Sequence, residues 1–232
     1  MLIVGLTGGT GSGKTEVARV LQKRRGIIVS GDGIGKEVVE KNSQVLKRLV
    51  KVFGRGILNK NGKLNRRKLG SLAFSSEKNQ MKLNRIIHPQ LLKELRRKIA
   101  LARKSESEGK FLVVDAALIT EWGLEKELDM TVLVASPVKL RSERLIKQGL
   151  NRKEAQDRIT RQLSDGQRRK KADYVIQNDG SLKELRRKAV MLYHIIMVLN
   201  GLDQLERLAR RFDSLRKKGY IKESMLQNSQ AV

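Results

Sequence analysis

Five short apolar runs divide the chain, and longer stretches of mixed polarity separate them. Each run spans three to five residues, which is typical of a buried strand and too short for a helix. The runs lie at residues 2–6, 26–30, 111–115, 131–135 and 174–176. Strands that alternate with helical stretches in this way predict an α/β protein.

Between these runs, apolar residues recur at intervals of three and four, which is typical of amphipathic helices. One helix is expected to bend at His88-Pro89, because proline interrupts the hydrogen bonding of a helix. The dipeptide Asn200-Gly201 is expected to end another helix. The expected helices cover residues 15–21, 36–52, 66–74, 78–103, 140–148, 152–163, 181–199 and 202–217.

The first strand leads directly into the glycine-rich stretch Gly-Gly-Thr-Gly-Ser-Gly-Lys-Thr at residues 8–15. A G-x-x-x-x-G-K-T pattern between a strand and a helix is the phosphate-binding loop, or P-loop. Its backbone N–H groups and the helix dipole attract phosphate oxygens, Lys14 can reach the β- and γ-phosphates, and the Thr15 hydroxyl can hold Mg²⁺. The chain is therefore expected to bind a nucleoside triphosphate with Mg²⁺. The residues expected at the nucleotide are Gly9, Gly11, Ser12, Gly13, Lys14, Thr15 and Glu16.

Two acidic residues follow strands that are expected to end beside this loop. Asp32 comes after the second strand, at the edge of an open α/β sheet where ligands bind. It can accept a proton from an attacking hydroxyl or help to hold the metal, or it can simply cap the helix that starts near Ile34. Position alone leaves these alternatives open. Asp115 ends the apolar run Phe-Leu-Val-Val, a Walker B-like pattern that predicts a place near Mg²⁺.

The chain divides into a core and three helical parts. Residues 1–33 and 104–200 are expected to form the nucleotide-binding core. Residues 34–103 are too many for a simple crossover, so we expect an inserted lobe that faces the P-loop and binds the phosphoryl acceptor. Residues 137–170 are expected to form a lid that closes over the triphosphate. Residues 201–232 are expected to be a helical extension, and the sequence gives them no role.

The expected lid is rich in basic residues. A solvated helical hairpin explains most of them, and only one or two need to contact phosphate. The basic residues of this segment include Arg141, Arg144, Lys147, Arg152, Arg158 and Arg161.

The composition indicates the location and partners of the protein more than its chemistry. The 232 residues include 50 Lys and Arg against 24 Asp and Glu, a formal net charge of +26. Such a charge attracts polyanions, yet it is spread along the chain, so we expect a basic surface with at most weak affinity for RNA. There are no cysteines, no apolar run long enough to span a membrane, and a core strand at the N-terminus. A cytoplasmic protein that does not bind membranes, monomeric or weakly oligomeric, fits these features.

Taken in order, these motifs resemble the dephospho-CoA kinase family from residue 2 to about residue 185. The P-loop alone is shared with many kinases, whereas the other pieces in this order are much more specific. They are Asp32, Phe53-Gly54, Asn61-Gly62 with Arg66, Leu83-Asn84 with His88-Pro89, Asp115 with Glu121, Arg144-Leu145, Arg158-Ile159 with Gln162, and Ala172-Asp173 with Asn178.

The resemblance implies a P-loop kinase fold with a five-stranded parallel sheet, a helical acceptor-binding lobe and a helical lid. It implies transfer of the γ-phosphoryl group of ATP to the 3′-hydroxyl of dephospho-CoA, the last step of coenzyme A biosynthesis. Asp32, Lys14 and Arg144 fall on catalytic positions, and Thr15 and Asp115 on metal-binding positions. The acceptor would contact Asp32, Arg66, His88, Asp115 and Glu121, with His88 shaping the lobe and Glu121 orienting Arg66 or another arginine of the lobe by an ion pair.

The chain departs from the family pattern at three places. Glu16 puts an acid beside the α-phosphate, Ala116 replaces a proline, and Lys147-Gln148 stands where a second lid arginine is usual. Lys147 can act there as a point charge without bidentate geometry. The alternatives to this family are another P-loop nucleoside or nucleotide kinase and an RNA-associated NTP-binding protein. The last lacks the interleaved aromatic residues that stack on bases.

Overall fold

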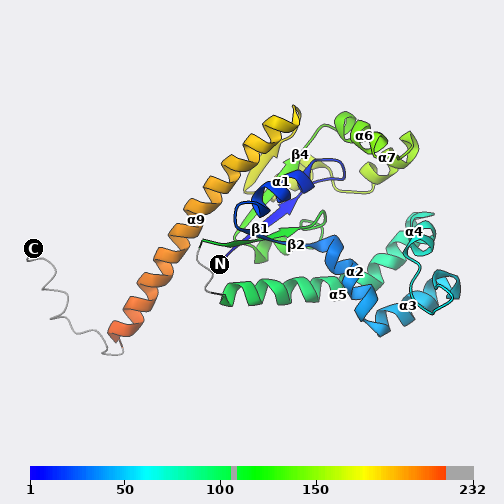
Figure 1. The fold of residues 1–232 in the computed structure, drawn as a ribbon, viewed down its shortest axis with the longest axis horizontal. Helices are drawn as coiled ribbons and strands as arrows, with labels where there is room; N and C mark the ends of the chain where they lie inside the picture. Colours follow the sequence, from blue (N-terminus) through cyan, green and yellow to red (C-terminus); the bar gives the residue numbers. More distant parts are fainter. Residues whose placement is uncertain (106–108, 218–232) are drawn as a thin grey trace, which may run out of the picture.

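A five-stranded parallel sheet forms the centre of the protein in the computed structural model (Figure 1). The structure describes residues 1–105 and 109–217, with the backbone alone described for residue 74 and residues 202–217. The strand order is β2-β3-β1-β4-β5, and the expected five-stranded parallel sheet is therefore confirmed. The strands are β1 Leu2–Thr7, β2 Gly26–Ser30, β3 Phe111–Asp115, β4 Met130–Ala135 and β5 Tyr174–Gln177.

Helices cover both faces of this sheet and extend beyond its carboxyl edge. On one face lie α1 and α9, on the other the lobe built from α2 to α5, and α6 to α8 follow β4 (Figure 1). Their bounds are α1 Lys14–Gln22, α2 Gly31–Lys41, α3 Ser43–Phe53, α4 Arg66–Phe74, α5 Glu77–Lys104, α6 Val138–Lys147, α7 Arg152–Thr160, α8 Asp165–Arg169 and α9 Leu182–Lys217, with short 3₁₀ turns at Arg55–Ile57 and Leu124–Glu127.

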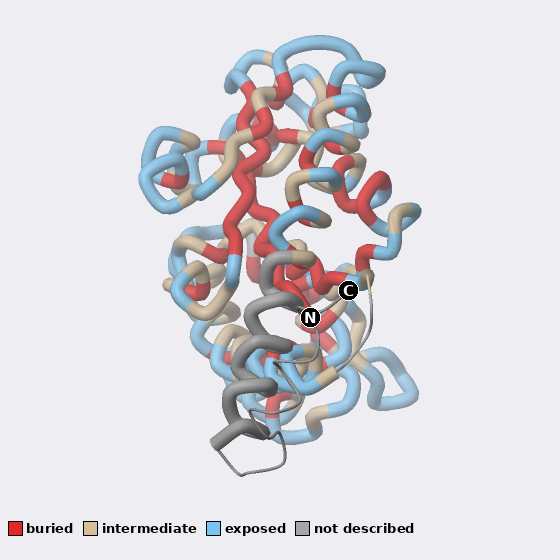
Figure 2. Tube along the Cα trace, turned by 90° about the vertical axis from the view of Figure 1, so that its left-hand side faces the viewer, coloured by how far each residue is buried: buried red, intermediate tan, exposed pale blue. Residues whose placement is uncertain are grey.

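Alternate residues of the strands supply two separate apolar cores. Ile3 and Leu112 pack with the lobe, whereas Leu2, Val4 and Val113 pack with α1 and α9. Figure 2 shows the buried chain running through the middle of the molecule. The continuous apolar runs in the sequence are explained by this burial, because a sheet covered on both faces has no polar side.

The strand order brings the P-loop and both acidic segments to one edge. Within the sheet, Asp115 at the end of β3 is level with Leu6 of β1 and with Ser30 of β2. β3 therefore lies between the strand that leads into the P-loop and the strand that leads to Asp32. Since all strands run in the same direction, the segments that follow them meet at the carboxyl edge, where open α/β sheets bind ligands.

The single helix expected over residues 36–52 is wrong, because Asn42 divides it into α2 and α3. Asn42 is extended, with φ −104° and ψ 99°, and its Oδ1 accepts hydrogen bonds from the backbone N–H groups of Gln44 and Val45. An asparagine in this conformation is a strong helix N-cap, so it starts α3 in a new direction. Periodicity alone did not reveal the break, since both helices bury apolar residues in the same core.

The helix end expected at Asn200-Gly201 is also wrong, because α9 continues through it to Lys217. Asn200 is buried, and its Nδ2 donates to the carbonyl of Lys110 at 3.3 Å. The Asn200 side chain is thus bound to the residue that precedes β3. A glycine inside a helix costs only about 1 kcal/mol, which the rest of the helix can offset. The part of the expected helical extension that follows residue 217 lies outside the described residues.

The helix expected over residues 152–163 ends earlier, at Thr160, and is followed by the separate short helix α8. Ser164 caps α8 in a capping box with Gln167, which fixes where the new helix begins. The intervening segment, residues 161–164, is therefore free to turn toward the P-loop.

Within the described residues, no helix combines the length and the apolar composition needed to cross a bilayer.

Replacement of Leu95 tests how far the lobe depends on its contact with the sheet. Leu95 is fully buried in α5 and belongs to the core shared with β1 and β3. We expect Leu95→Ala to lower the free energy of unfolding by about 3 kcal/mol, from lost burial and a residual cavity. Leu101→Ala on the same helix is the control, because Leu101 is 55% exposed. Urea unfolding compares the two, and equal small losses would contradict a shared core.

Candidate active site

The P-loop is held in shape by glycine conformations and by side chains from distant elements. Gly11 and Gly13 have φ of 78° and 102°, in the region that favours glycine. Ser12 N–H donates to the Gly9 carbonyl at 3.0 Å inside the loop. Asn178, just after β5, donates from Nδ2 to the Ser12 carbonyl at 2.7 Å. The loop is thus bound to the segment that follows the edge strand β5.

Lys14 folds back along the loop and lies near other charged groups. Its Nζ donates to the carbonyl of Gly8 at 2.8 Å. Burial lowers the pKa of Lys14, whereas Asp115 and Asp32 act in the opposite direction. Burial likewise raises the pKa of Asp115, which the charge of Lys14 opposes. The lysine and both carboxylates that the sequence singled out therefore lie within electrostatic reach of one another.

Asp32 lies in the first turn of α2, and it is not the residue that caps this helix. Ser30 is the N-cap, and its Oγ accepts from the backbone N–H of Gly33 at 3.2 Å. The alternative that Asp32 serves as the helix cap is thus wrong. Its carboxylate is exposed and lines a cavity of 690 Å³ between the sheet edge and the lobe.

We call it the acceptor-side cavity because it lies against the lobe that is expected to bind the acceptor, and several residues singled out from the sequence line it. Asp32, Arg66 and His88 line it, whereas Asp115 and Glu121 do not. Residues Ala116–Leu118 form its floor on the sheet side, and Arg161 and Gln162 close it from the segment between α7 and α8. Arg161 also donates to Gln80 of α5 at 3.3 Å, so the expected lid contacts the lobe directly.

His88 is paired with the one tryptophan of the chain. Trp122 Nε1 donates to His88 Nδ1 at 3.3 Å, and the two rings are edge-on at 5.3 Å. Burial lowers the pKa of His88, which favours the neutral ring that can accept this hydrogen bond. The arrangement gives His88 a role in shaping the cavity wall.

Glu121 does not pair with Arg66, so the expected ion pair between them is wrong. Arg66 instead contacts Glu40 and donates to the carbonyl of Lys36 at 3.2 Å. Glu121 binds Arg168 of α8 at 2.7 Å, and Arg168 is fully buried. Arg168 lies outside the lobe. A buried guanidinium without a carboxylate partner is strongly destabilising, whereas water solvates an exposed guanidinium. This explains why Glu121 pairs with Arg168 and not with Arg66.

Arginines of α6 lie against the P-loop. Arg144 Nη1 donates to the Gly11 carbonyl at 3.2 Å and to Ser136 Oγ at 3.0 Å, and Nη2 donates to the Asn178 carbonyl at 3.4 Å. Arg141 Nε donates to the Thr10 carbonyl at 2.9 Å. Lys147, one turn later, is exposed.

The acid that departs from the usual loop sequence is neutralised by neighbours. Glu16 accepts a hydrogen bond from Arg186 of α9 at 2.6 Å and also contacts Arg19. The Arg186 hydrogen bond holds the pKa of Glu16 below its usual value. Its negative charge is therefore drawn toward α9, away from the loop backbone.

Three side chains at the P-loop were given no individual role by the sequence reasoning. These are Arg141, Asn178 and Gln162, whose Oε1 accepts from the Thr10 N–H at 2.8 Å. All three stand in stretches that sequence reasoning had noted, two of them in the motif pieces. Only the fold reveals that residues about 130 to 170 positions away contact the loop.

The comparisons with known proteins point to one family. A family model described as dephospho-CoA kinase matches residues 2–184. A dephospho-CoA kinase of Corynebacterium diphtheriae is 44% identical over 83% of this chain and 96% of its own length. One from Bacillus licheniformis is 39% identical over 79% of this chain and 90% of its own.

Solved structures agree on the fold. A Thermus thermophilus protein of 31% identity matches with a TM-score of 0.65 over 82% of this chain and 96% of its own. A dephospho-CoA kinase of Campylobacter jejuni matches with the same TM-score at 22% identity, over 85% of this chain and 98% of its own. The latter likeness concerns the fold alone.

Removal of Glu121 tests the buried ion pair. Glu121→Ala leaves the guanidinium of Arg168 buried without its nearest carboxylate, so we expect a loss of about 3 kcal/mol in the free energy of unfolding. Glu94→Ala is the control, because Glu94 pairs at 2.6 Å with an exposed arginine, Arg97, and should change stability far less. Denaturant titration measures both. Equal effects would mean that Glu121 does not compensate Arg168.

Proposed function

This chain belongs to the dephospho-CoA kinase family, and on that premise we propose how its residues carry out the transfer of the γ-phosphoryl group of ATP to the 3′-hydroxyl of dephospho-CoA. The products are coenzyme A and ADP. One observation carries the assignment of roles: the carboxylate of Asp32 lines the 690 Å³ acceptor-side cavity and also acts on the charge of the P-loop lysine. A carboxylate that faces an open cavity thus lies within electrostatic reach of the P-loop lysine.

Asp32 accepts the proton of the attacking hydroxyl. The ribose 3′-oxygen forms a bond to the γ-phosphorus, the bond between that phosphorus and the β,γ-bridging oxygen breaks, and ADP leaves. The hydroxyl proton passes to the Asp32 carboxylate. Its exposure toward the cavity supports this role, since a base has to reach the proton that it accepts.

Lys14 and the backbone of the P-loop supply the positive charge that phosphoryl transfer requires. Catalysis of this reaction is chiefly positioning and electrostatic stabilisation. Lys14 is half-buried and its Nζ is fixed by the Gly8 carbonyl, so little reorganisation is needed when the charge on the phosphates shifts. Arg144 braces the loop at Gly11 and adds charge at its lid side.

The residues present also fit a magnesium ion carried by the substrate. No cluster of three or more metal-binding side chains occurs within the described part of the chain. Mg²⁺ commonly keeps its waters and binds through one or two carboxylates and the substrate phosphates. Asp115 and the Thr15 hydroxyl offer such oxygen ligands. When bound, the ion would neutralise charge on the β- and γ-phosphates.

Arg66 and His88 define the acceptor end of the cavity. Arg66 is fixed to α2 through Glu40 and Lys36, which supports a contact with the anionic part of dephospho-CoA. His88, held by Trp122, shapes the wall. The cytoplasmic location, the weak affinity for RNA and the monomeric or weakly oligomeric state expected from the sequence stay predictions.

The decisive assay offers the purified chain ATP, Mg²⁺ and dephospho-CoA, with a parallel panel of nucleosides and nucleotides. We expect coenzyme A and ADP to form in equal amounts, with little transfer to the panel. EDTA in excess over Mg²⁺ should abolish transfer, and added Mg²⁺ should restore it. Efficient transfer to another acceptor would overturn the acceptor assignment while leaving the nucleotide site in place.

Substitution of Asp32 separates chemistry from nucleotide binding. Asp32→Asn keeps the size of the side chain but cannot accept the proton, so we expect turnover to fall by a factor on the order of 10²–10⁴ with ATP affinity retained. Lys14→Ala should weaken both, because Lys14 is expected to contact phosphate in the ground state and in the transition state. Steady-state kinetics and equilibrium dialysis measure the two effects. Turnover of Asp32→Asn within a few-fold of the unchanged protein would exclude Asp32 as the base.

A further inference from the structure

Arg141 is a buried cation whose hydrogen-bonding capacity is not used. Its side chain is 3% exposed, and Nη2 has no hydrogen-bond partner among the described residues. Its Nε donates to the Thr10 carbonyl, and its nearest carboxylate, Asp165, lies 3.8 Å from Nη1, beyond hydrogen-bonding distance. A buried guanidinium with a free N–H₂ group is costly unless a further acceptor is supplied.

The counter-ion of Arg141 is shared. Oδ1 of Asp165 lies 3.9 Å from Arg168 as well, and Oδ2 accepts from the Ser136 N–H at 2.9 Å. Burial lowers the pKa of Arg141, Asp165 acts in the opposite direction, and Arg168 adds to the effect of burial. Arg168 also has Glu121 at 2.7 Å, whereas among the described residues the shared carboxylate at 3.8 Å is the only one paired with Arg141.

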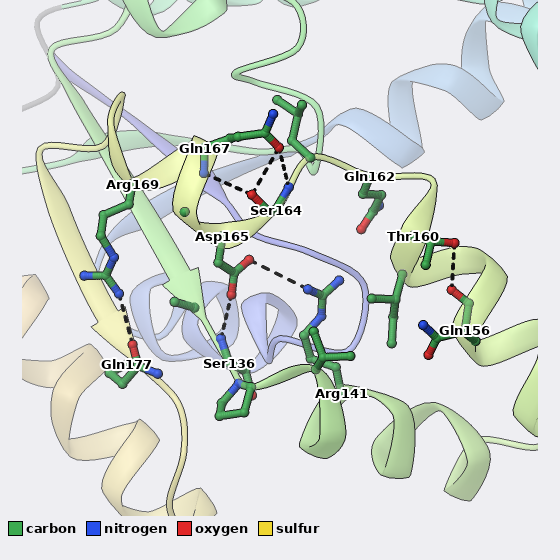
Figure 3. A pocket seen from close by; sticks show the side chains of 16 residues that line it. Ser136, Arg141, Gln156, Thr160, Gln162, Ser164, Asp165, Gln167, Arg169 and Gln177 are labelled. Atoms are coloured by element: carbon green, nitrogen blue, oxygen red, sulfur yellow. Dashed lines mark hydrogen bonds and ion pairs between the residues drawn. The ribbon is translucent and has the colours of Figure 1, made fainter.

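The free nitrogen lies against the P-loop at Gly9. A Cβ on Gly9 would collide with Nη2 and with the rest of the guanidinium, so the absence of a side chain there makes room for Arg141. Arg141 also lines a cavity of 590 Å³ that Gln162 and Asp165 border (Figure 3). In that view the guanidinium of Arg141 points toward Asp165.

The position along the loop indicates which phosphate is within reach. The N–H groups at the start of α1 hold the α- and β-phosphates, whereas the lysine side chain serves the β- and γ-phosphates. Lys14 reaches back to the carbonyl of Gly8, so the γ end of a bound triphosphate lies near the beginning of the loop. Gly9 and Thr10, the residues that Arg141 contacts, form that beginning.

The terminal nitrogens of the neighbouring arginines, Arg144 and Arg168, already have hydrogen-bond partners. Both terminal nitrogens of Arg144 bind oxygens of the loop and of the sheet end. Arg168 has an unpartnered Nε, but its terminal nitrogens bind Leu163 and Glu121, and it lines neither this cavity nor the acceptor-side cavity. Arg141 alone of these three has a free terminal nitrogen, and this nitrogen is buried against the P-loop at Gly9.

We propose that Arg141 is a further catalytic residue, whose Nη2 donates a hydrogen bond to the γ-phosphoryl group of the bound nucleoside triphosphate. The catalytic part of this inference rests on the proposed function, whereas the binding of a nucleoside triphosphate rests on the P-loop alone. During transfer, the γ-phosphorus exchanges its bond to the β,γ-bridging oxygen for one to the acceptor oxygen, and charge is spread over its other oxygens. A guanidinium fixed beside those oxygens stabilises that charge.

The test compares the affinities of ATP and ADP in the full chain. Arg141→Met removes the donor and keeps an unbranched apolar side chain. We expect ADP to bind within about threefold of the unchanged protein, ATP to bind about tenfold more weakly, and turnover to fall about 100-fold, as for the loss of one donor to a developing negative charge. Isothermal titration calorimetry and the coenzyme A assay supply these values.

Two controls separate this role from a structural one. Lys139→Met changes an exposed lysine on the same helix and should leave all three values unchanged. Arg141→Lys keeps the charge without the planar group, and should recover part of the preference for ATP over ADP. If Arg141→Met does not fold, the same ratio in Arg141→Lys decides, and it should lie below that of the unchanged protein.

The possible results distinguish a failure of the Arg141 proposal from a failure of the proposed function. Equal loss of ATP and ADP affinity, or turnover within a few-fold of the unchanged protein, would overturn the role of Arg141. If the unchanged protein makes no coenzyme A but binds ATP, the proposed function fails, and the ratio of ATP to ADP affinity still decides the role of Arg141. A chain that binds neither nucleotide would overturn both.

Discussion

Buried positive charge around the P-loop is the constraint on which the site depends. Arg141 and Arg168 are buried and Lys14 is half-buried, and desolvation of a cation is costly unless oxygens replace the water. Loop carbonyls, Asp165 and Glu121 supply part of that replacement. The remainder fits a polyanionic ligand. A site that holds its charges in place before the ligand arrives needs little reorganisation during phosphoryl transfer.

The same charges connect the two sides of the site. Arg168 binds Glu121, which follows the floor of the acceptor-side cavity, and it also shares Asp165 with Arg141 beside the P-loop. Gln162 accepts from the loop at Thr10 and lines the acceptor-side cavity. Movement of the segment between α7 and α8 would therefore alter contacts both at the P-loop and in the acceptor-side cavity. This arrangement suits a reaction that must exclude water until both are bound.

The sequence predicted those parts of the structure that depend on local pattern. The five strands, the P-loop and the placement of Asp32 and Asp115 at one edge follow from apolar runs and from the direction of parallel strands. Features that depend on partners far along the chain were missed or wrong. The helix break at Asn42, the continuation of α9 through Asn200 and the partner of Glu121 each rest on one polar side chain, whose partner periodicity does not specify.

The structure changes how the altered lid sequence is interpreted. The family pattern has a second arginine one turn after Arg144, where this chain has Lys147-Gln148, and Lys147 is exposed. Residues three apart on a helix share a face, and Arg141 precedes Arg144 by that interval on the side that contacts Thr10 and Gly11. A second guanidinium thus stands one turn before Arg144 instead of one turn after it. The charge that the departure seemed to remove is present at the loop, carried by a buried residue and not by an exposed one.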